Sequence, residues 1–147
     1  MLHVVVDAAN VVGSRPDGWW RDRPGAARRL AGRIAAALAT RPGDLAAALA
    51  GVDPTAPDPS GAAFRVHLVL EGAAKAAVDL PTHPLLDVVP APADGDAAIV
   101  ALVHELAPDR VVVVTADRGL RERVAAAGAA ATGPGRLLDA LPAAGVP

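Results

Sequence analysis

The sequence predicts an α/β fold, a three-layer helix–sheet–helix sandwich with a mainly parallel central sheet. Short valine-rich runs alternate along the chain with longer segments in which apolar residues recur every three or four positions. The runs are typical of strands buried on both faces, and the longer segments are typical of amphipathic helices. Because strands joined through helices are connected by right-handed crossovers, this alternation favours a parallel sheet with helices on both faces.

The first half of the chain is expected to contain two strands and two helices. Residues 2–6 (LHVVV) are the first strand, and residues 25–40 are a helix because leucine and isoleucine recur there every four positions. An Arg-Pro-Gly break separates this helix from a short second one at 44–50, which its first aspartate can cap. A Pro- and Asp-rich loop at 51–63 then leads to the second strand at 65–70 (RVHLVL).

The second half of the chain is expected to continue the alternation. The run at 110–114 (RVVVV) is the strongest strand, and Gly128 can end the helix that follows it. The expected elements are a short strand at 85–89, a helix at 97–106, the strand at 110–114, a helix at 118–127, a last short strand, a helical turn at 136–141 and a loose tail at 143–147. Because no internal repeat is recognisable, residues 1–147 are expected to form one domain.

The bulk composition favours a folded cytoplasmic protein. Apolar residues make up 52% and charged residues 20% of the 147 residues, which is ordinary for a globular domain. The absence of cysteine excludes disulfides, thiolate metal sites and thiol catalysis, and it fits a reducing compartment. We expect neither a signal peptide nor a membrane span, because no run approaches roughly 18 apolar residues. With a formal net charge of −2, any surface that attracts nucleic acid must be local.

Five acidic residues fall where the predicted strands end or where the next helix begins. Asp7, Glu71 and Asp117 each follow a strand, and Asp94 and Asp96 open the helix before the strongest strand. Since these positions share one edge of a parallel sheet, the acids can converge on one crevice. Clustered carboxylates raise one another's pKa unless a cation lies between them, and an all-oxygen set suits Mg²⁺ or Mn²⁺ rather than zinc.

Each acid also has a structural explanation. An aspartate before a helix is an N-cap worth about 1 kcal/mol, and Asp94 and Asp117 both stand before predicted helices. Asp7 is different, because the next predicted helix begins at residue 25 and leaves no nearby helix for it to cap. Glu71 is a poor N-cap type. The set therefore indicates a site more strongly than any member does.

The acids lie in four stretches, VVVDAANVVGS, VLEG, ADGDAAIV and VVVVTADRGLRERV. In this order they resemble the PIN-like NYN nuclease domains, particularly the YacP-like branch. The resemblance extends over residues 4–138. It implies a PIN-like, Rossmann-like helix–sheet–helix fold and the activity of a divalent-metal-dependent ribonuclease.

The resemblance also implies a role for each matching position. Asp7 would be the first metal-binding carboxylate, with Asn10 as its polar neighbour. Asp96 would be the acid that opens the central helix, and Asp117 the acid after the central strand. Arg118 stands beside Asp117, and its role stays open between steadying the phosphate or the leaving oxygen, which a guanidinium matches, and a solvated side chain of the first helical turn. These five residues are the expected catalytic set.

Two acids match the family pattern less closely. The second strand of such domains usually ends in aspartate, and here Glu71 stands in that place. Its role stays open between direct metal ligand, ligand through water, and neither. Asp94 is a further metal candidate, although Asp96 is favoured because it directly abuts the helix.

The expected reaction is the hydrolysis of internal phosphodiester bonds of RNA, which is the activity of an endoribonuclease. One or two Mg²⁺ or Mn²⁺ ions would activate a water and neutralise charge on the scissile phosphate. No protein nucleophile is required. RNA is therefore the expected partner, and association with a ribosome or with a second copy of the chain stays open.

A local basic segment supports RNA as the partner. Residues 15–33 contain six arginines against two aspartates, together with both tryptophans of the chain. Arginine binds phosphate, and an exposed indole stacks on an unpaired base. We expect one indole to pack beneath the loop and the other to stay accessible. The residues assigned to nucleic-acid binding are Arg15, Trp19, Trp20, Arg21, Arg23, Arg28 and Arg29.

Two other functional classes compete with the nuclease. A non-catalytic RNA-binding module would keep the fold and the basic segment. Glu71 favours it, and the intact Asp7, Asp96 and Asp117 argue against it. A phospho-acceptor domain would show paired acids at the first strand end and a lysine late in the sheet. This chain has one acid there, and its only lysine, Lys75, follows the second strand.

Overall fold

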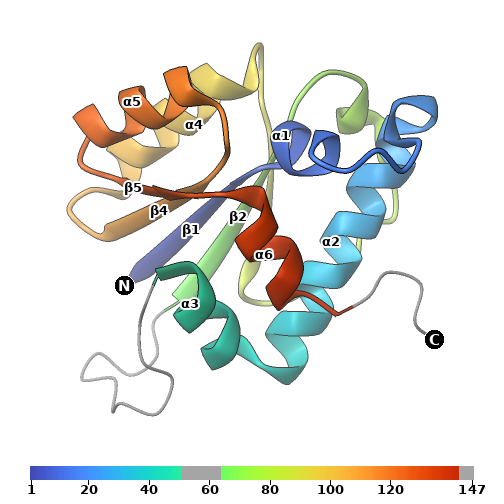
Figure 1. Ribbon diagram of the computed structural model, residues 1–147, viewed down its shortest axis with the longest axis horizontal. Coiled ribbons are helices and arrows are strands. Elements are labelled where there is room, and N and C mark those ends of the chain that lie inside the picture. The colour runs from blue at the N-terminus through green and yellow to red at the C-terminus, as the bar shows by residue number, and fades with distance from the viewer. Residues whose placement is uncertain (51–63, 143–147) are drawn as a thin grey trace.

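The computed structural model describes residues 1–50 and 64–142. The loop and the tail predicted at 51–63 and 143–147 lie outside the described residues. Helices pack on both faces of a five-stranded sheet (Figure 1). Among the helices described, none is both long and apolar enough to cross a membrane.

The strands of the sheet all run parallel, which confirms the predicted fold class. They are β1 (Leu2–Asp7), β2 (Phe64–Leu70), β3 (Leu86–Pro90), β4 (Arg110–Val114) and β5 (Ala130–Thr132). Their spatial order is β3-β2-β1-β4-β5. The chain moves outward from β1 to β3 and then returns to the other side of β1, so the topological switch point lies between β1 and β4. Open α/β sheets bind ligands at the carboxyl ends of the strands beside such a point.

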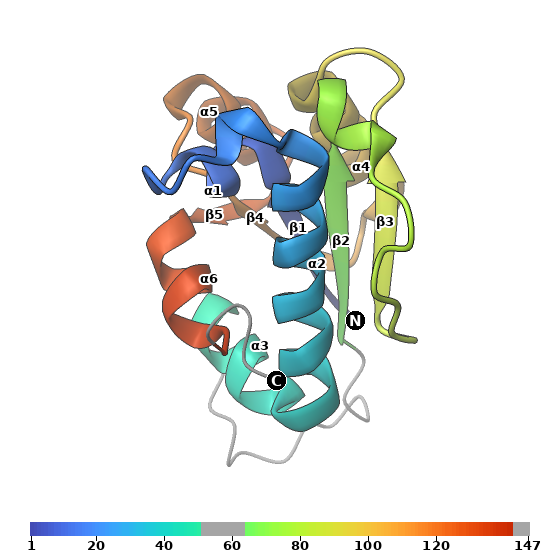
Figure 2. The ribbon, with the colours of Figure 1, turned by 90° about the vertical axis from the view of Figure 1, so that its right-hand side faces the viewer.

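Helices form the two outer layers (Figures 1 and 2). The helices of one layer are α1 (Ala8–Gly13), α2 (Arg23–Thr40), α3 (Pro42–Ala50) and α6 (Pro134–Ala140), and those of the other are α4 (Gly95–Leu106) and α5 (Arg118–Ala126). Two short 3-10 helices complete the described elements: η1 (Trp19–Arg21) lies between α1 and α2, and η2 (Gly72–Ala76) lies between β2 and β3. In Figure 2, α1 and α5 lie toward the upper end of the sheet.

The central strand β1 divides its side chains between two cores. Val4 and Val6 pack in the core of the α2 layer, whereas Val5 packs in the core of the α4–α5 layer. Each of these valines is 0% exposed. Since alternate residues of a strand point to the same face, Asp7 lies on the face of Val5, toward α4 and α5.

One element of the fold was not predicted from the sequence. Helix α1 begins at Ala8, directly after β1, where a long polar loop was expected. The expectation that Asp7 has no helix to cap was therefore wrong: Asp7 is the N-cap of α1 and accepts a hydrogen bond from the Asn10 backbone N–H at 3.3 Å. Six residues (AANVVG) are too few to show an apolar period.

Several helices also begin earlier than their apolar pattern suggests. Helix α2 starts at Arg23, where Asp22 accepts from the Gly25 N–H, and α4 starts at Gly95. The cap predicted at Asp44 was wrong, because α3 begins at Pro42 and Asp44 lies in its first turn. First turns are polar and readily take proline, so the hydrophobic period does not reveal them.

Candidate functional site

Asp7 lies at the carboxyl end of β1 and is 6% exposed. Its Oδ2 accepts a hydrogen bond from Thr115 Oγ1 at 2.9 Å, while its Oδ1 accepts from Asn10. Burial raises the pKa of Asp7 above its usual range, and the charges of Asp96 and Glu71 add to the rise. The groups that oppose the rise are the two hydrogen-bond donors. Folding therefore leaves this carboxylate poorly solvated and beside other acids.

Asn10 and Thr115 join the end of β1 to the loop after β4. The Asn10 side-chain oxygen accepts from the Ala116 N–H at 2.8 Å, and Thr115 Oγ1 accepts from the Asp117 N–H at 3.2 Å. Thr115 is fully buried. Asn10 thus positions the loop with its side chain and Asp7 with its backbone. Thr115 was not assigned a role from the sequence, although it directly follows the valines of β4.

Asp117 and Asp94 both cap helices, as their positions in the sequence allowed. Asp117 Oδ1 accepts from the Leu120 N–H at 2.9 Å, and Asp94 Oδ1 accepts from the Ala97 N–H at 2.7 Å. Both side chains are exposed at the carboxyl edge of the sheet. Capping accounts for the hydrogen bond of one oxygen of each carboxylate. Both carboxylates also lie at the edge of the sheet where the predicted site would be.

Asp96 occupies the first turn of α4 and is half-buried. Burial raises its pKa first, and the charges of Asp117 and Glu71 raise it further. Arg123 on α5 partly opposes this rise. Arg123 was missed from the sequence, because helix phase decides which arginine of α5 lies nearest the acids. Arg118, the predicted one, is the exposed first residue of that helix.

Glu71 stands between Asp7 and the start of α4. Its Oε2 accepts from the Gly95 N–H at 2.7 Å, which satisfies a backbone donor of the helix terminus. The approach is close, since a Cβ at Gly95 would lie 3.0 Å from the Glu71 carboxyl carbon. Glu71 therefore has a structural role, and its charge also reaches both Asp7 and Asp96.

The acids offer a hard, all-oxygen donor set that fits Mg²⁺ or Mn²⁺. Within residues 1–50 and 64–142, no three His, Asp or Glu side chains converge as a formed metal site. Mg²⁺ commonly keeps several waters and uses only one or two carboxylates, so a loose arrangement suits it. The raised pKa values of Asp7 and Asp96 are the feature that a bound cation would relieve.

A cleft of about 410 Å³ on the α1–α2 side is lined by two of the acids, Glu71 and Asp94. We name it the Trp19 cleft; its lining residues are Ala8, Ala9, Val12, Trp19, Arg23, Ala27, Glu71, Gly72, Ala74, Ala93 and Asp94. Trp19 is half-buried and Trp20 is 51% exposed, which confirms the prediction that one indole packs and the other stays accessible. Arg23 lies 5.1 Å from the centroid of Trp19, and Arg21 lies 5.9 Å from that of Trp20.

The other predicted RNA-binding arginines lie outside this cleft. Arg15 and Arg29 line a separate small pocket of about 80 Å³. Arg15 also lies 4.0 Å from Asp139. Arg28 donates to the Val78 carbonyl at 2.9 Å. The structure therefore brings only Arg23 and Trp19 into the cleft beside the acids.

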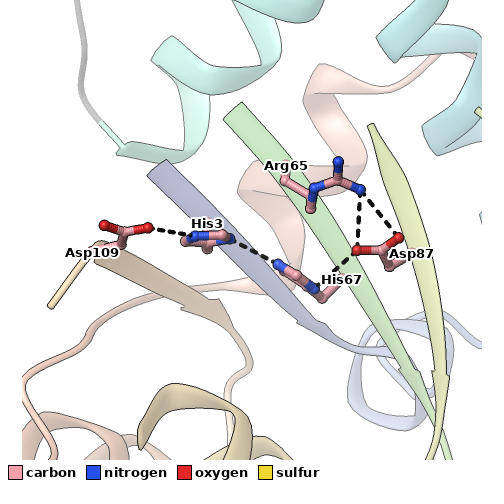
Figure 3. Close-up of polar contacts among 5 residues, drawn as sticks. All are labelled: His3, Arg65, His67, Asp87 and Asp109. Atoms are coloured by element: carbon pink, nitrogen blue, oxygen red, sulfur yellow. Dashed lines mark hydrogen bonds and ion pairs between the residues drawn. The ribbon is translucent and has the colours of Figure 1, made fainter. Parts of the chain in front are cut away.

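Two of the four histidines, His3 and His67, meet at the opposite end of the sheet (Figure 3). His3 Nδ1 lies 2.9 Å from His67 Nε2, and both rings are buried. His3 Nε2 lies 3.1 Å from Asp109, and His67 Nδ1 lies 3.6 Å from Asp87. Arg65 in turn donates to both oxygens of Asp87 at 3.1 and 3.2 Å. We name these five residues the histidine network.

No family model matches the chain, and no curated protein matches it. Among solved structures, the chain is similar to the crystal structure of Rae1 (YacP) from Bacillus subtilis, with a TM-score of 0.62 and 18% sequence identity. The similarity covers 95% of this chain and 74% of that chain. At this identity the likeness concerns the fold. The chain has a fold like that of Rae1 (YacP), and YacP is also the branch whose motifs the sequence resembles.

Proposed function

We propose that this protein is a divalent-metal-dependent endoribonuclease that hydrolyses RNA phosphodiester bonds. The observation that supports it best is the pair of carboxylates at Asp7 and Asp96, each with a raised pKa and each beside further acids. Burying like charges together lowers stability, and active sites are where proteins accept such a cost. The pair stands at the switch point of the sheet, where ligands bind in this class of fold.

In the proposed site, Asp7, Asp96 and Asp117 hold Mg²⁺ or Mn²⁺, with Glu71 and Asp94 at the flanks. The bound ion supplies an activated water and charge neutralisation at the phosphate. Asn10 and Thr115 are positioning residues for Asp7 in this scheme, because their hydrogen bonds fix its two oxygens.

Two arginines of the proposed site interact with negative charges, one on a carboxylate and one on the phosphate. Arg123 partly opposes the rise in the pKa of Asp96. Arg118, exposed at the start of α5, is proposed to donate to a phosphate oxygen, which a guanidinium matches well.

RNA is the proposed substrate because the acids adjoin a basic, tryptophan-containing segment in a protein of net charge −2. Arg23 and Trp19 line the cleft that reaches Glu71 and Asp94. A cytoplasmic location fits the absence of cysteine. Binding to a ribosome and formation of a homodimer stay predictions.

A non-catalytic RNA-binding module on the same fold is the second candidate. Two observations favour it: Glu71 is engaged by the Gly95 N–H, and the described acids do not converge as a formed metal site. The phospho-acceptor class is disfavoured, because the chain places one acid at the end of β1 and its only lysine, Lys75, in η2 after the second strand.

Cleavage of a pool of single-stranded and hairpin RNAs tests the proposal. Wild type is assayed with Mn²⁺, with Mg²⁺ and with EDTA, beside Asp7→Asn and Asp96→Asn. Glu105→Gln is the matched control, since Glu105 is exposed toward the far end of α4. Cleavage that requires both the metal and the two acids supports the nuclease. RNA binding without cleavage in either metal supports the binding module, and neither binding nor cleavage contradicts both.

A further inference from the structure

The Trp19 cleft has the size and lining of a site for one flat, uncharged group. Its volume of about 410 Å³ lies within the range of small-molecule sites. Alanine and valine side chains of α1, α2 and η2 supply its apolar surface. Because alanines line so much of it, space is left that larger side chains would fill.

Trp19 forms one wall of the cleft, and its indole is held in place. The ring lies against α1, where a Cβ at Gly13 would be 3.7 Å from the Trp19 six-membered ring. Trp20 packs edge-to-face against it, with ring centroids 5.9 Å apart. An indole fixed before a ligand arrives loses little conformational entropy on stacking.

The charged residues of the cleft favour a neutral group inside it and a phosphate at its rim. Two of the carboxylates of the proposed site, Glu71 and Asp94, line the cleft, and Arg23 lies beside Trp19. A phosphate is repelled by the two carboxylates and attracted by the guanidinium. A neutral base meets the apolar surface and the indole, and the carboxylates can accept hydrogen bonds from its amino groups or from a ribose hydroxyl.

We propose that the Trp19 cleft binds an unpaired RNA base, the base of a nucleotide next to the phosphate at which the proposed hydrolysis takes place. This inference rests on the proposed function, because it assigns the cleft to the same RNA. A base held in a duplex cannot leave its stack to enter the cleft without a cost in unpairing. The enzyme is therefore specific for a single-stranded nucleotide at this position.

RNA binding in EDTA tests the cleft without requiring cleavage. The probes are a fluorescent single-stranded oligonucleotide, the same strand annealed to its complement, and a strand whose nucleotides lack bases. Trp19→Leu keeps apolar bulk but removes the stacking surface, and Trp19→Phe restores an aromatic ring. We expect Trp19→Leu to weaken single-strand binding about tenfold, since stacking on one aromatic side chain is worth that much or more. Trp19→Phe should recover most of the loss.

A second pair of variants blocks the cleft without touching the indole. Ala9→Leu adds bulk at an exposed lining position of α1, and Ala36→Leu adds the same bulk at an exposed position of α2 outside the cleft. We expect Ala9→Leu to weaken single-strand binding about as much as Trp19→Leu, and Ala36→Leu to leave it unchanged. Circular dichroism confirms that each variant is folded.

Binding to the duplex and to the strand without bases separates this inference from simple charge attraction. Both should bind wild type and Trp19→Leu equally. If Trp19→Leu weakens all three probes alike, or weakens none, the cleft is not a base site. A failure of the proposed nuclease would appear instead as no cleavage by wild type in any metal, whichever way these binding experiments turn out.

Discussion

The two ends of the central strand present polar side chains on the same face of the sheet, and they differ in how those side chains are balanced. At the amino end, His3 lies in the histidine network, where each ring contacts a carboxylate and the other ring. At the carboxyl end, Asp7 lies beside Asp96 and Glu71, and these neighbours raise its pKa. Buried polar groups with complementary partners stabilise a fold, whereas gathered like charges oppose it.

This difference separates a structural cluster from a candidate site. The histidine network is held within the chain, because each ring nitrogen of His3 and His67 contacts another member of the network. In the acid cluster (Asp7, Glu71, Asp94, Asp96 and Asp117), like charges raise the pKa values of Asp7 and Asp96, and under the proposed function a bound cation balances these charges. Polar residues at one end of the strand are therefore interpreted as structural and those at the other end as a candidate site. The sign of the neighbouring charges distinguishes the two cases.

The largest effect should be on cleavage, and it should appear at one end only. Asp7→Asn is expected to lower kcat/KM by about 100-fold or more, since a metal ion supplies several kcal/mol of transition-state stabilisation. His3→Gln should keep the wild-type rate per folded molecule. Rates measured at a temperature where both variants are folded check this. Equal losses in the two variants would remove the distinction between the ends.

The next effect should be on stability, and it should appear at the other end. His3→Ala leaves His67 and Asp109 without their buried partner. We expect the free energy of unfolding to fall by about 2 to 4 kcal/mol. His104→Ala, at an exposed position of α4, should change it by less than about 0.5 kcal/mol. Urea unfolding at neutral pH measures both; a fall of similar size in the two variants would show that the network contributes nothing special.

The two ends should also respond to pH with opposite signs. Burial, together with the charge of His3, lowers the pKa of His67 to about 4, from 6.5 in the unfolded chain. The folded state then binds fewer protons than the unfolded state, so stability from this group is complete above pH 6.5 and falls as the pH drops toward 4. The loss approaches about 3 kcal/mol by linkage.

The acids have the reverse dependence. Burial raises the folded pKa of Asp7 and Asp96 above the unfolded value of 3.8. Their contribution is therefore most favourable below pH 3.8 and is lost as the pH rises through the folded pKa. Unfolding free energies of wild type, His67→Gln and Asp96→Asn between pH 7 and 4 separate the two. A His67→Gln curve as steep as that of wild type would contradict the assignment to His67.

The smallest effect should be a gain of stability at the acid end without metal. The raised pKa of Asp96 indicates that burial and repulsion outweigh the favourable helix dipole. Asp96→Asn should therefore stabilise the metal-free protein by about 0.5 kcal/mol, as removal of functional charges often does. Glu105→Gln is the control on the same helix. A destabilised Asp96→Asn in EDTA would mean that this acid serves the fold.

Much of this fold could be predicted because its strands are apolar on both faces. Strand β4 has the predicted bounds, since four consecutive valines favour only a buried strand. Helix α1 could not be predicted from six residues, and with it the capping role of Asp7 was missed. The acids could be predicted to share one edge because parallel strands place their carboxyl ends together, a rule that needs no knowledge of register.

The partners of those residues depend on tertiary geometry instead. Glu71 meets Gly95 only because β2 and the start of α4 adjoin, and no local pattern marks that contact. His3 and His67 meet because β1 and β2 pair in one particular register, which places His3 beside Arg65 and Val5 beside His67. Strand sequences this uniform do not specify their register from one chain alone.

The melting temperature with and without Mn²⁺ tests most directly the proposal that the acids at the carboxyl end of β1 bind a divalent cation. Wild type, Asp7→Asn and Asp96→Asn are each melted in EDTA and in excess Mn²⁺. A ligand that binds only the folded state stabilises it by mass action. We predict that Mn²⁺ raises the melting temperature of wild type by several degrees and leaves both variants unchanged. The same melting temperature for wild type in Mn²⁺ and in EDTA, or an equal shift in all three proteins, would contradict the account.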